Sequence, residues 1–128
     1  MVKKIQLSLS IPKDVQITGD PVYLKRLFSN LVDNAIKFTQ EGGQVAVHLD
    51  ARAKEAAIKV TDNGIGIEPE MIEKVFLRFY RTDQARSQEG AGLGLNIARA
   101  ICEAHQGEIF IESQPGRGTI VTVKLAIA

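Results

Sequence analysis

Hydrophobic residues recur with two different periods in the first third of the chain. In residues 4–12, KIQLSLSIP, every second residue is apolar, which predicts a half-buried strand that ends at Pro12. In residues 19–39 the period changes to that of a helix, with Asp20 as the cap and Pro21 in the first turn. Its apolar stripe consists of Leu24, Leu27, Phe28, Leu31, Ala35 and Phe38. The helix is expected to stop at the following EGG.

The rest of the chain predicts further strands and helices in a mixed order. Residues 44–51 and 55–62 alternate and read as two strands of a hairpin, and the acidic, proline-containing start of residues 68–76 predicts a short helix. No period is sustained over residues 78–92, so we expect a mobile loop there. Residues 93–107 predict another helix, and residues 108–114 and 119–127 predict two final strands joined by the turn PGRG.

This order predicts a mixed α/β (α+β) fold, because strands and helices neither alternate strictly nor separate into two halves. Each strand alternates and therefore shows one face to a core, so we expect a two-layer sandwich with the helices on one face of the sheet. The 128 residues suit a single domain, residues 1–128, and 45% hydrophobic against 24% charged residues is typical of a folded globular protein.

Charge and cysteine content exclude some functions. Sixteen basic and fifteen acidic residues nearly cancel, so no overall field indicates nucleic acid or an anionic membrane as a partner. Cys102 has no second cysteine to pair with and lies in a helical pattern, which indicates a core thiol. The chain has no apolar run long enough to span a bilayer, and a reducing, cytoplasmic setting fits best.

Three sets of residues stand out from this pattern of helices and strands as candidates for binding. Asn30, Asn34 and Lys37 share one stripe beside the apolar face of the first helix, which suits either a solvated flank or a polar ligand. The segment DNGIGI, residues 62–67, suits either an ordinary turn or a binding loop. The segment GAGLGL, residues 90–95, precedes a helix and suits either a flexible loop or a phosphate site, with Arg78, Arg81 and Arg86 nearby.

Taken in order, five segments resemble the five boxes of the ATP-binding catalytic domain of sensor histidine kinases. They are NLVDNAIKFT, DNGIGI, VFLRFYR, GAGLGLNIA and GRGT, and the resemblance runs from about Gly19 to Leu125. The family belongs to the superfamily of gyrase, chaperone, histidine kinase and mismatch-repair ATPases. The resemblance implies a Bergerat-type fold: a mixed, mostly antiparallel sheet, about three helices on one face, and a mobile ATP lid over residues 78–92.

The resemblance also implies how the nucleotide is bound. Asp62 would accept a hydrogen bond from the exocyclic amine of adenine, and Gly64 and Gly66 would let the backbone bend under the base. Phe76 and Phe79 would anchor the lid. The nucleotide-binding set further comprises Ile67, Phe79, Tyr80, Gly90, Gly92, Leu93, Gly94, Leu95 and Thr119.

Four residues are implied to be catalytic. Asn34 would be the Mg²⁺ ligand, Lys37 would face the phosphate chain, Asn30 would support the metal site, and Arg81 would touch the γ-phosphate. Ala91 departs from the family, which often has a hydroxyl residue there, so one hydrogen bond to phosphate is expected to be missing.

The implied activity is transfer of the γ-phosphoryl group of ATP to a histidine on a separate helical dimerisation domain, and then to a response regulator. That domain is absent from the sequence, so we expect an isolated monomeric domain, inactive in autophosphorylation, from a longer kinase that is either anchored in a membrane or not. His48 and His105 read as a surface residue and a helix-dipole partner, respectively.

The alternative functions are a serine or dehydrogenase kinase of the same fold, or a nucleotide-binding regulatory module without transferase activity. Hydrolytic relatives carry a glutamate base where this chain has Asn30, and a carboxamide cannot accept that proton.

Overall fold

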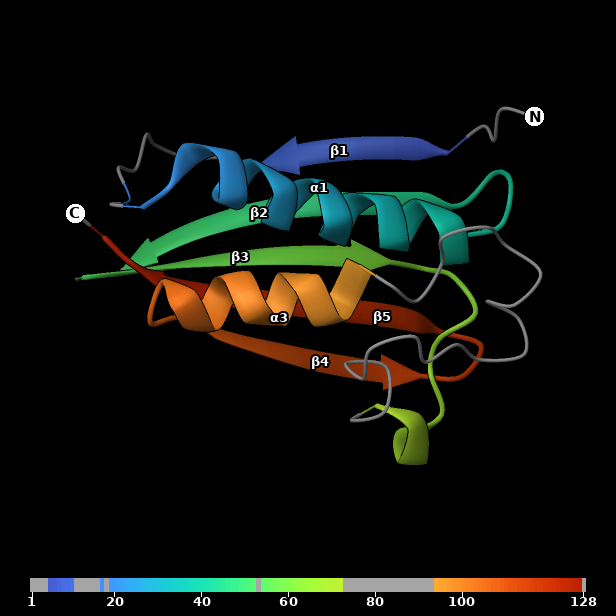
Figure 1. Ribbon diagram of the computed structural model, residues 1–128. Coiled ribbons are helices and arrows are strands. Elements are labelled where there is room, and N and C mark those ends of the chain that lie inside the picture. Colours follow the sequence, from blue (N-terminus) through green and yellow to red (C-terminus); the bar gives the residue numbers. More distant parts are fainter. Residues whose placement is uncertain (1–4, 11–16, 18, 53, 73–93, 128) are drawn as a thin grey trace.

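A five-stranded sheet forms one layer of the protein (Figure 1). The computed structural model describes residues 5–10, 17, 19–52, 54–72 and 94–127. The strand order is β1-β2-β3-β5-β4, with β1 parallel to β2 and all other neighbours antiparallel. The strands are β1 (Gln6–Ser10), β2 (Gln44–Arg52), β3 (Glu55–Asp62), β4 (Glu108–Gln114) and β5 (Gly118–Ala126).

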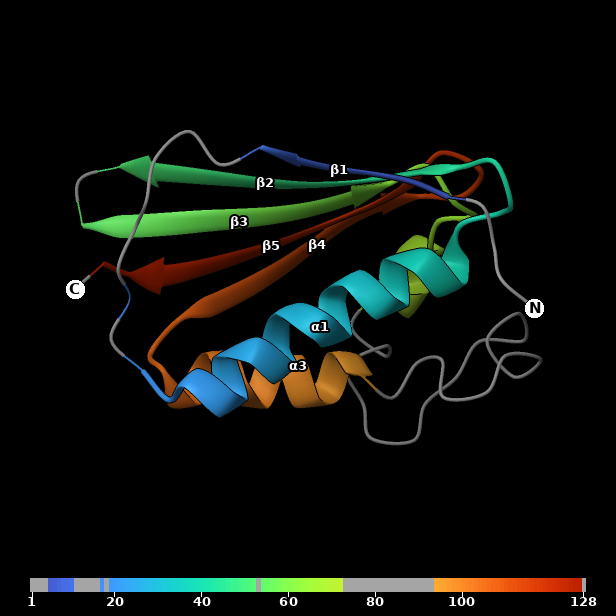
Figure 2. The same ribbon diagram turned by 90° about the horizontal axis from the view of Figure 1, so that it is seen from above.

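Two helices, α1 (Pro21–Phe38) and α3 (Gly94–Ala104), cover one face of this sheet, as Figure 2 shows. The predicted two-layer, mostly antiparallel α/β architecture is therefore confirmed. Of the helix predicted over residues 68–76, the described part forms the short 3-10 helix η1 (Pro69–Met71), and the rest lies outside the described residues. The loop predicted over residues 78–92 lies outside them as well. No helix in the described part of the chain is long and apolar enough to cross a membrane.

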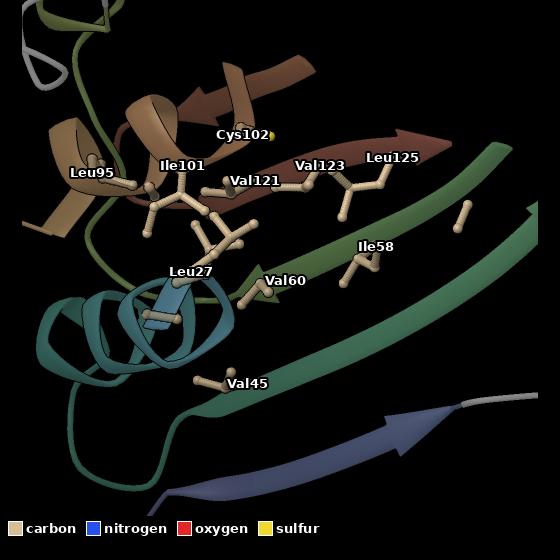
Figure 3. Close-up of a cluster of buried hydrophobic side chains, with 14 residues drawn as sticks. Leu27, Val45, Ile58, Val60, Leu95, Ile101, Cys102, Val121, Val123 and Leu125 are labelled. Atoms are coloured by element: carbon tan, nitrogen blue, oxygen red, sulfur yellow. The ribbon is translucent and has the colours of Figure 1, made fainter. Parts of the chain in front are cut away.

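The core lies between the helices and the sheet (Figure 3). Side chains of α1 and α3 meet those of β2, β3 and β5 there, and Leu27 of α1 and Ile101 of α3 both belong to this cluster. Fully burying one leucine side chain stabilises a fold by about 1.5–3 kcal/mol. The buried hydrophobic residues are Leu27, Leu31, Ala35, Val45, Ala56, Ile58, Val60, Leu95, Ala98, Ile101, Cys102, Val121, Val123 and Leu125.

The ends of α1 follow from local hydrogen bonding. Oδ1 of Asp20 accepts the N–H groups of Val22 (2.9 Å) and Tyr23 (3.3 Å), so two helix donors that lack a partner within the helix are satisfied. At the other end, the buried hydroxyl of Thr39 donates to the carbonyl of Ala35 at 2.6 Å. These caps fix the bounds of the helix that carries Asn30, Asn34 and Lys37, called the asparagine stripe below.

Cys102 is the expected core thiol. Its side chain is fully buried, and its Sγ donates to the carbonyl of Glu108 at 3.4 Å. Burial is the main cause that raises the pKa of this thiol to about 11, with smaller contributions from Glu103 and Glu108. The thiolate, the reactive form, is therefore disfavoured.

Leu7 departs from the burial that alternation predicts. Its register partner in β2 is Val45, a core residue, so Leu7 faces the helix layer. Nevertheless it is 51% exposed. The reason is position: β1 is the edge strand next to β2, and α1 makes its main contacts with β2 and β3 of the sheet.

Candidate nucleotide-binding site

Four residues form one cross-strand row near one end of the sheet. Val45 of β2 is paired with Asp62 of β3, Asp62 with Thr119 of β5, and Thr119 with Ser113 of β4. Residues paired directly across antiparallel strands share a face, and Val45 faces the core under the helices. The row therefore begins with an apolar residue, Val45, and continues with three polar ones beneath the helix layer. A polar group that is buried there needs a hydrogen-bond partner.

Asp62 is the charged residue of this row and is only 8% exposed. Its Oδ1 accepts the N–H of Gly64 at 2.9 Å, and the backbone N–H of Thr119 also donates to its side chain. Burial raises the pKa of this carboxyl, although the two backbone hydrogen bonds act in the opposite direction. Within the described part of the chain, Asp62 forms no ion pair. A carboxylate has about four lone-pair sites, so capacity for a further donor remains.

The loop that follows Asp62 is fixed to α1 and to the β4–β5 turn. The N–H of Ile65 donates to the carbonyl of Phe38 at 3.2 Å, and the N–H of Gly116 donates to the carbonyl of Ile65 at 2.8 Å. The N–H of Ile67 donates to Oγ of Ser113 at 2.7 Å. The loop thus joins the end of α1 to the last hairpin, beside the row that holds Asp62.

The glycines of this region allow backbone segments to approach each other. A Cβ on Gly64 would lie 2.1 Å from the carbonyl oxygen of Phe38, and one on Gly66 would lie 2.1 Å from that of Gln114. A Cβ on Gly118 would lie 2.0 Å from the carbonyl oxygen of Asp62. Gly66 and Gly118 also have positive φ angles of 75° and 114°. Loop docking therefore accounts for these glycines, and the bending of backbone under a base stays a prediction for Gly64 and Gly66.

The asparagine stripe lies on the C-terminal half of α1. Asn34 is buried, at 8% exposure, and Asn30 and Lys37 are half-buried. Nδ2 of Asn30 and Nδ2 of Asn34 are buried donors without a hydrogen-bond partner in the described structure. Asn34 lies four residues, about 6 Å along the axis, before Phe38, which holds the loop of Asp62. The stripe and Asp62 are thereby brought to the same end of the molecule.

The start of α3 adds a residue that the sequence analysis did not single out. Oδ1 of Asn96 is a buried acceptor without a partner in the described structure. In this respect it resembles Nδ2 of Asn30 and Nδ2 of Asn34, which are buried donors without a partner. Gly94 begins α3, and Leu95 lies in the core. The sequence around Asn96 predicts only a helix with an apolar face. The residue is recognised as unusual only from its buried position in the structure.

Several predicted site residues lie outside the described residues: Phe76, Arg78, Phe79, Tyr80, Arg81, Arg86, Gly90, Gly92 and Leu93. Ile67 and Thr119 are placed by the structure, and both are connected through Ser113, which belongs to none of the five sequence segments. Ser113 is therefore the second residue that sequence analysis missed. Its signal is spatial, since it is the register partner of Thr119.

The chemistry of the described residues is compatible with a magnesium ion. They contain no cluster of three or more His, Cys, Asp or Glu side chains that could hold a metal. Mg²⁺ needs no such cluster, because it keeps several waters and takes one or two protein oxygens together with substrate phosphates. The carboxamide of Asn34, whose Nδ2 makes no hydrogen bond in the described part, can supply one such oxygen.

Comparison with known proteins agrees with this geometry. Residues 19–128 match the family of histidine kinase-, DNA gyrase B- and HSP90-like ATPases. The chain is 43% identical over 116 residues to the sensor histidine kinase RppB of Synechocystis, covering 89% of this chain and 26% of RppB. The mycobacterial sensor histidine kinase MprB superposes with a TM-score of 0.82 at 33% identity, covering 97% of this chain and 83% of that one. Full-length ShkA in complex with AMPPNP superposes with a TM-score of 0.80 at 29% identity, covering 98% of this chain and 26% of that one.

The fold, the match over most of the chain and these relatives define an ATP-binding catalytic domain of the histidine kinase type. The chain belongs to the family of histidine kinase-, DNA gyrase B- and HSP90-like ATPases, and within it to the sensor histidine kinases, to which its relatives belong. It spans about a quarter of the length of RppB.

Proposed function

We propose that the chain binds Mg·ATP and donates the γ-phosphoryl group to a histidine on a separate helical domain of a two-component sensor kinase. That histidine then passes the phosphoryl group to an aspartate of a response regulator. Residues 1–128 form the ATP-binding domain of this kinase, which works in the cytoplasm. The relatives support the proposal by their names as sensor histidine kinases, and ShkA by its complex with the ATP analogue AMPPNP.

The observation that carries the proposal is the buried carboxylate of Asp62. It is held by two backbone N–H groups and retains capacity for a further donor. The exocyclic amine of adenine supplies such a donor, whereas guanine presents a carbonyl there and would leave two acceptors facing each other. Asp62 is therefore proposed to recognise adenine, with Gly64, Gly66, Ile67 and Thr119 shaping its surroundings.

The stripe on α1 is proposed to meet the phosphates. Asn34 would hold Mg²⁺ through its carboxamide oxygen, Asn30 would support the ion and its waters, and Lys37 would face the phosphate chain. Bound Mg²⁺ supplies charge neutralisation on the β- and γ-phosphates. Arg81, Phe79, Tyr80, Gly90, Gly92, Leu93, Gly94 and Leu95 complete the proposed nucleotide-binding set.

The phospho-acceptor is proposed to lie on another domain, because neither histidine of the chain suits that role. His105 uses both ring nitrogens in hydrogen bonds, with the backbone N–H of Asp20 and the carbonyl of Ile101. His48 lies exposed on β2, opposite Lys59. A serine or dehydrogenase kinase of the same fold remains the alternative enzyme, and a regulatory module without transferase activity the alternative outside catalysis.

Calorimetric titration of Asp62→Asn with Mg·ATP tests the nucleotide site. The variant loses a charge-assisted hydrogen bond and gains a buried amide that is mispaired with the adenine amine. ATP binding should therefore weaken by about 2 kcal/mol or more. Asp50→Asn is the matched control, because Asp50 lies on β2 in an exposed pair with Arg52, at 3.2 Å. Unchanged ATP affinity in Asp62→Asn would remove this residue from the adenine site.

A further inference from the structure

Ser113 is a hydrogen-bonding centre next to the proposed base site. Its Oγ lies 2.7 Å from the backbone N of Ile67, 3.0 Å from the carbonyl O of Gly118 and 2.8 Å from Oγ1 of Thr119. The hydroxyl therefore touches the loop after Asp62, the backbone of β5 and a buried side chain of β5. A serine hydroxyl has one proton and two lone pairs, so three partners use its whole capacity.

The chemistry of two of these partners fixes the direction of the third bond. The N–H of Ile67 can only donate, which uses one lone pair of Ser113. The carbonyl of Gly118 can only accept, so the Ser113 proton must point to it, since two oxygens without a proton between them would repel each other at 3.0 Å. One lone pair of Ser113 remains. The hydroxyl of Thr119 must therefore donate to Ser113.

This direction determines what Thr119 offers to a ligand. With its proton committed to Ser113, Oγ1 of Thr119 presents only lone pairs elsewhere. Thr119 is 9% exposed and is paired directly with Asp62, whose ionised carboxylate also only accepts. The two side chains thus form an edge of acceptors at the end of β3 and β5.

We propose that Ser113 is a positioning residue for base selection: it holds the Thr119 hydroxyl as a donor toward itself, so that Thr119 and Asp62 together accept N–H or water donors. The proposal deepens the proposed function and rests on it. A base with an amine at its six position satisfies this edge, directly or through a water, whereas a base with a carbonyl there faces acceptors. Without Ser113, the Thr119 hydroxyl can rotate and donate to that carbonyl.

The test compares ATP with ITP, which has a carbonyl in place of the adenine amine. Calorimetry with Mg²⁺ measures both Kd values for the intact chain, Ser113→Ala, Thr119→Val and the double variant. The intact chain should prefer ATP, and Ser113→Ala should reduce the preference about tenfold, the effect of one mispaired hydrogen bond. In the Thr119→Val background, Ser113→Ala should leave the preference unchanged, because the hydroxyl through which it acts is gone.

Ser8→Ala, on the exposed edge strand β1, is the matched control and should keep the preference of the intact chain. An unchanged preference in Ser113→Ala would overturn the proposal. An equal fall in the Thr119→Val background would overturn it too, because Ser113 would then act through the loop of Ile67.

Neutron diffraction of the nucleotide-free chain separates this inference from the proposed function. The deuteron of Thr119 should point to Ser113, and that of Ser113 to the carbonyl of Gly118. A chain that binds no nucleotide but shows these positions would defeat the proposed function and keep the hydrogen-bond direction. A Ser113 deuteron directed at Thr119 would overturn the inference, whatever the chain binds.

Discussion

Nε2 of His105 accepts the backbone N–H of Asp20 at 3.1 Å, which joins the end of α3 to the start of α1. Nδ1 of the same ring lies 2.8 Å from the carbonyl of Ile101, so it must carry the ring proton. Both ring nitrogens of His105 are therefore in use, one at the carbonyl end of α3 and the other at the start of α1. A Cβ on Gly19 would lie 2.5 Å from Cδ2 of this ring, so the imidazole also packs against the backbone.

Replacing His105 by alanine should therefore loosen the two helices. Loss of two hydrogen bonds, one of which leaves the Asp20 N–H without its protein partner, should lower the free energy of unfolding by about 1–2 kcal/mol. Urea denaturation followed by circular dichroism measures it. His48→Ala, an exposed strand residue, is the control and should change stability little. Equal stability of His105→Ala and the intact chain would show that the link between the helices is energetically neutral.

Gly66→Ala should destabilise the fold more than Gly42→Ala does. Both glycines have positive φ angles, 75° and 84°, which cost a residue with a Cβ about 1–2 kcal/mol. A Cβ on Gly66 would also collide with the carbonyl of Gln114, whereas nothing lies within 4 Å of one on Gly42. Urea denaturation measures the free energy of unfolding of both variants. The difference between them reports how closely the loop at Gly66 approaches Gln114, the last residue of β4. Equal losses would mean that only φ strain matters.

The same glycines illustrate what the sequence could and could not predict. The pattern of DNGIGI indicated a turn with unusual backbone freedom, and the fold class followed from alternation and helix caps. Which carbonyl each glycine meets depends on strands that lie far away in the chain, such as Gln114 for Gly66. The exposed Leu7 has the same origin, since an alternating pattern does not state whether a strand lies at a sheet edge.

The candidate site was predictable only as far as its sequence segments reach. Asn34 and Asp62 could be singled out because they belong to recognisable patterns, and the structure places them at one end of the molecule. Ser113 and Asn96 could not, because a serine near the end of a strand and an asparagine in a helix have no distinctive spacing. Their importance arises from cross-strand register and from an unpaired buried atom.

The stability of Asp62→Asn relative to the intact chain should depend on pH in a defined direction. Burial raises the pKa of Asp62 in the folded chain above its ordinary value of 3.8. The folded state then holds the proton more tightly than the unfolded state, so this group favours folding below about pH 3.8 and loses that contribution as pH rises through the folded pKa. The asparagine does not titrate. The free energy of unfolding of the nucleotide-free variant, relative to the intact chain, should therefore increase with pH over this window.

Urea denaturation of both proteins from about pH 3 to pH 7 measures this trend. Asp50→Asn again serves as the control, since Asp50 lies in a partly exposed pair with Arg52. A difference between Asp62→Asn and the intact chain that stays constant with pH, or that shifts in favour of the intact chain as pH rises, would contradict the burial of an ionised carboxylate.

Asn34→Ala should remove the magnesium-dependent part of ATP affinity. The proposed role of Asn34 is to offer one oxygen to Mg²⁺, so the variant should bind ATP with similar affinity with and without the ion. The chain should remain folded, because the Asn34 Nδ2 already lacks a partner in the described structure. Calorimetry with and without Mg²⁺ measures this, with the exposed Ser29→Ala on α1 as the control. Retention of a full magnesium effect would move the metal site elsewhere.

The proposed function requires that this chain hold the phosphoryl donor and that another domain supply the acceptor. Correct placement of an acceptor can contribute about 7–11 kcal/mol to lowering a barrier, so the chain alone should bind Mg·ATP without labelling itself or releasing phosphate quickly. The most direct measurement is incubation with γ-labelled ATP and Mg²⁺, with and without the histidine-bearing helical domain of the parent kinase. Acid-labile label on that domain, absent with Asn34→Ala and absent from the chain alone, is the predicted result. Strong labelling of His48 or His105 in the isolated chain, or rapid phosphate release without a partner, would contradict the proposed function.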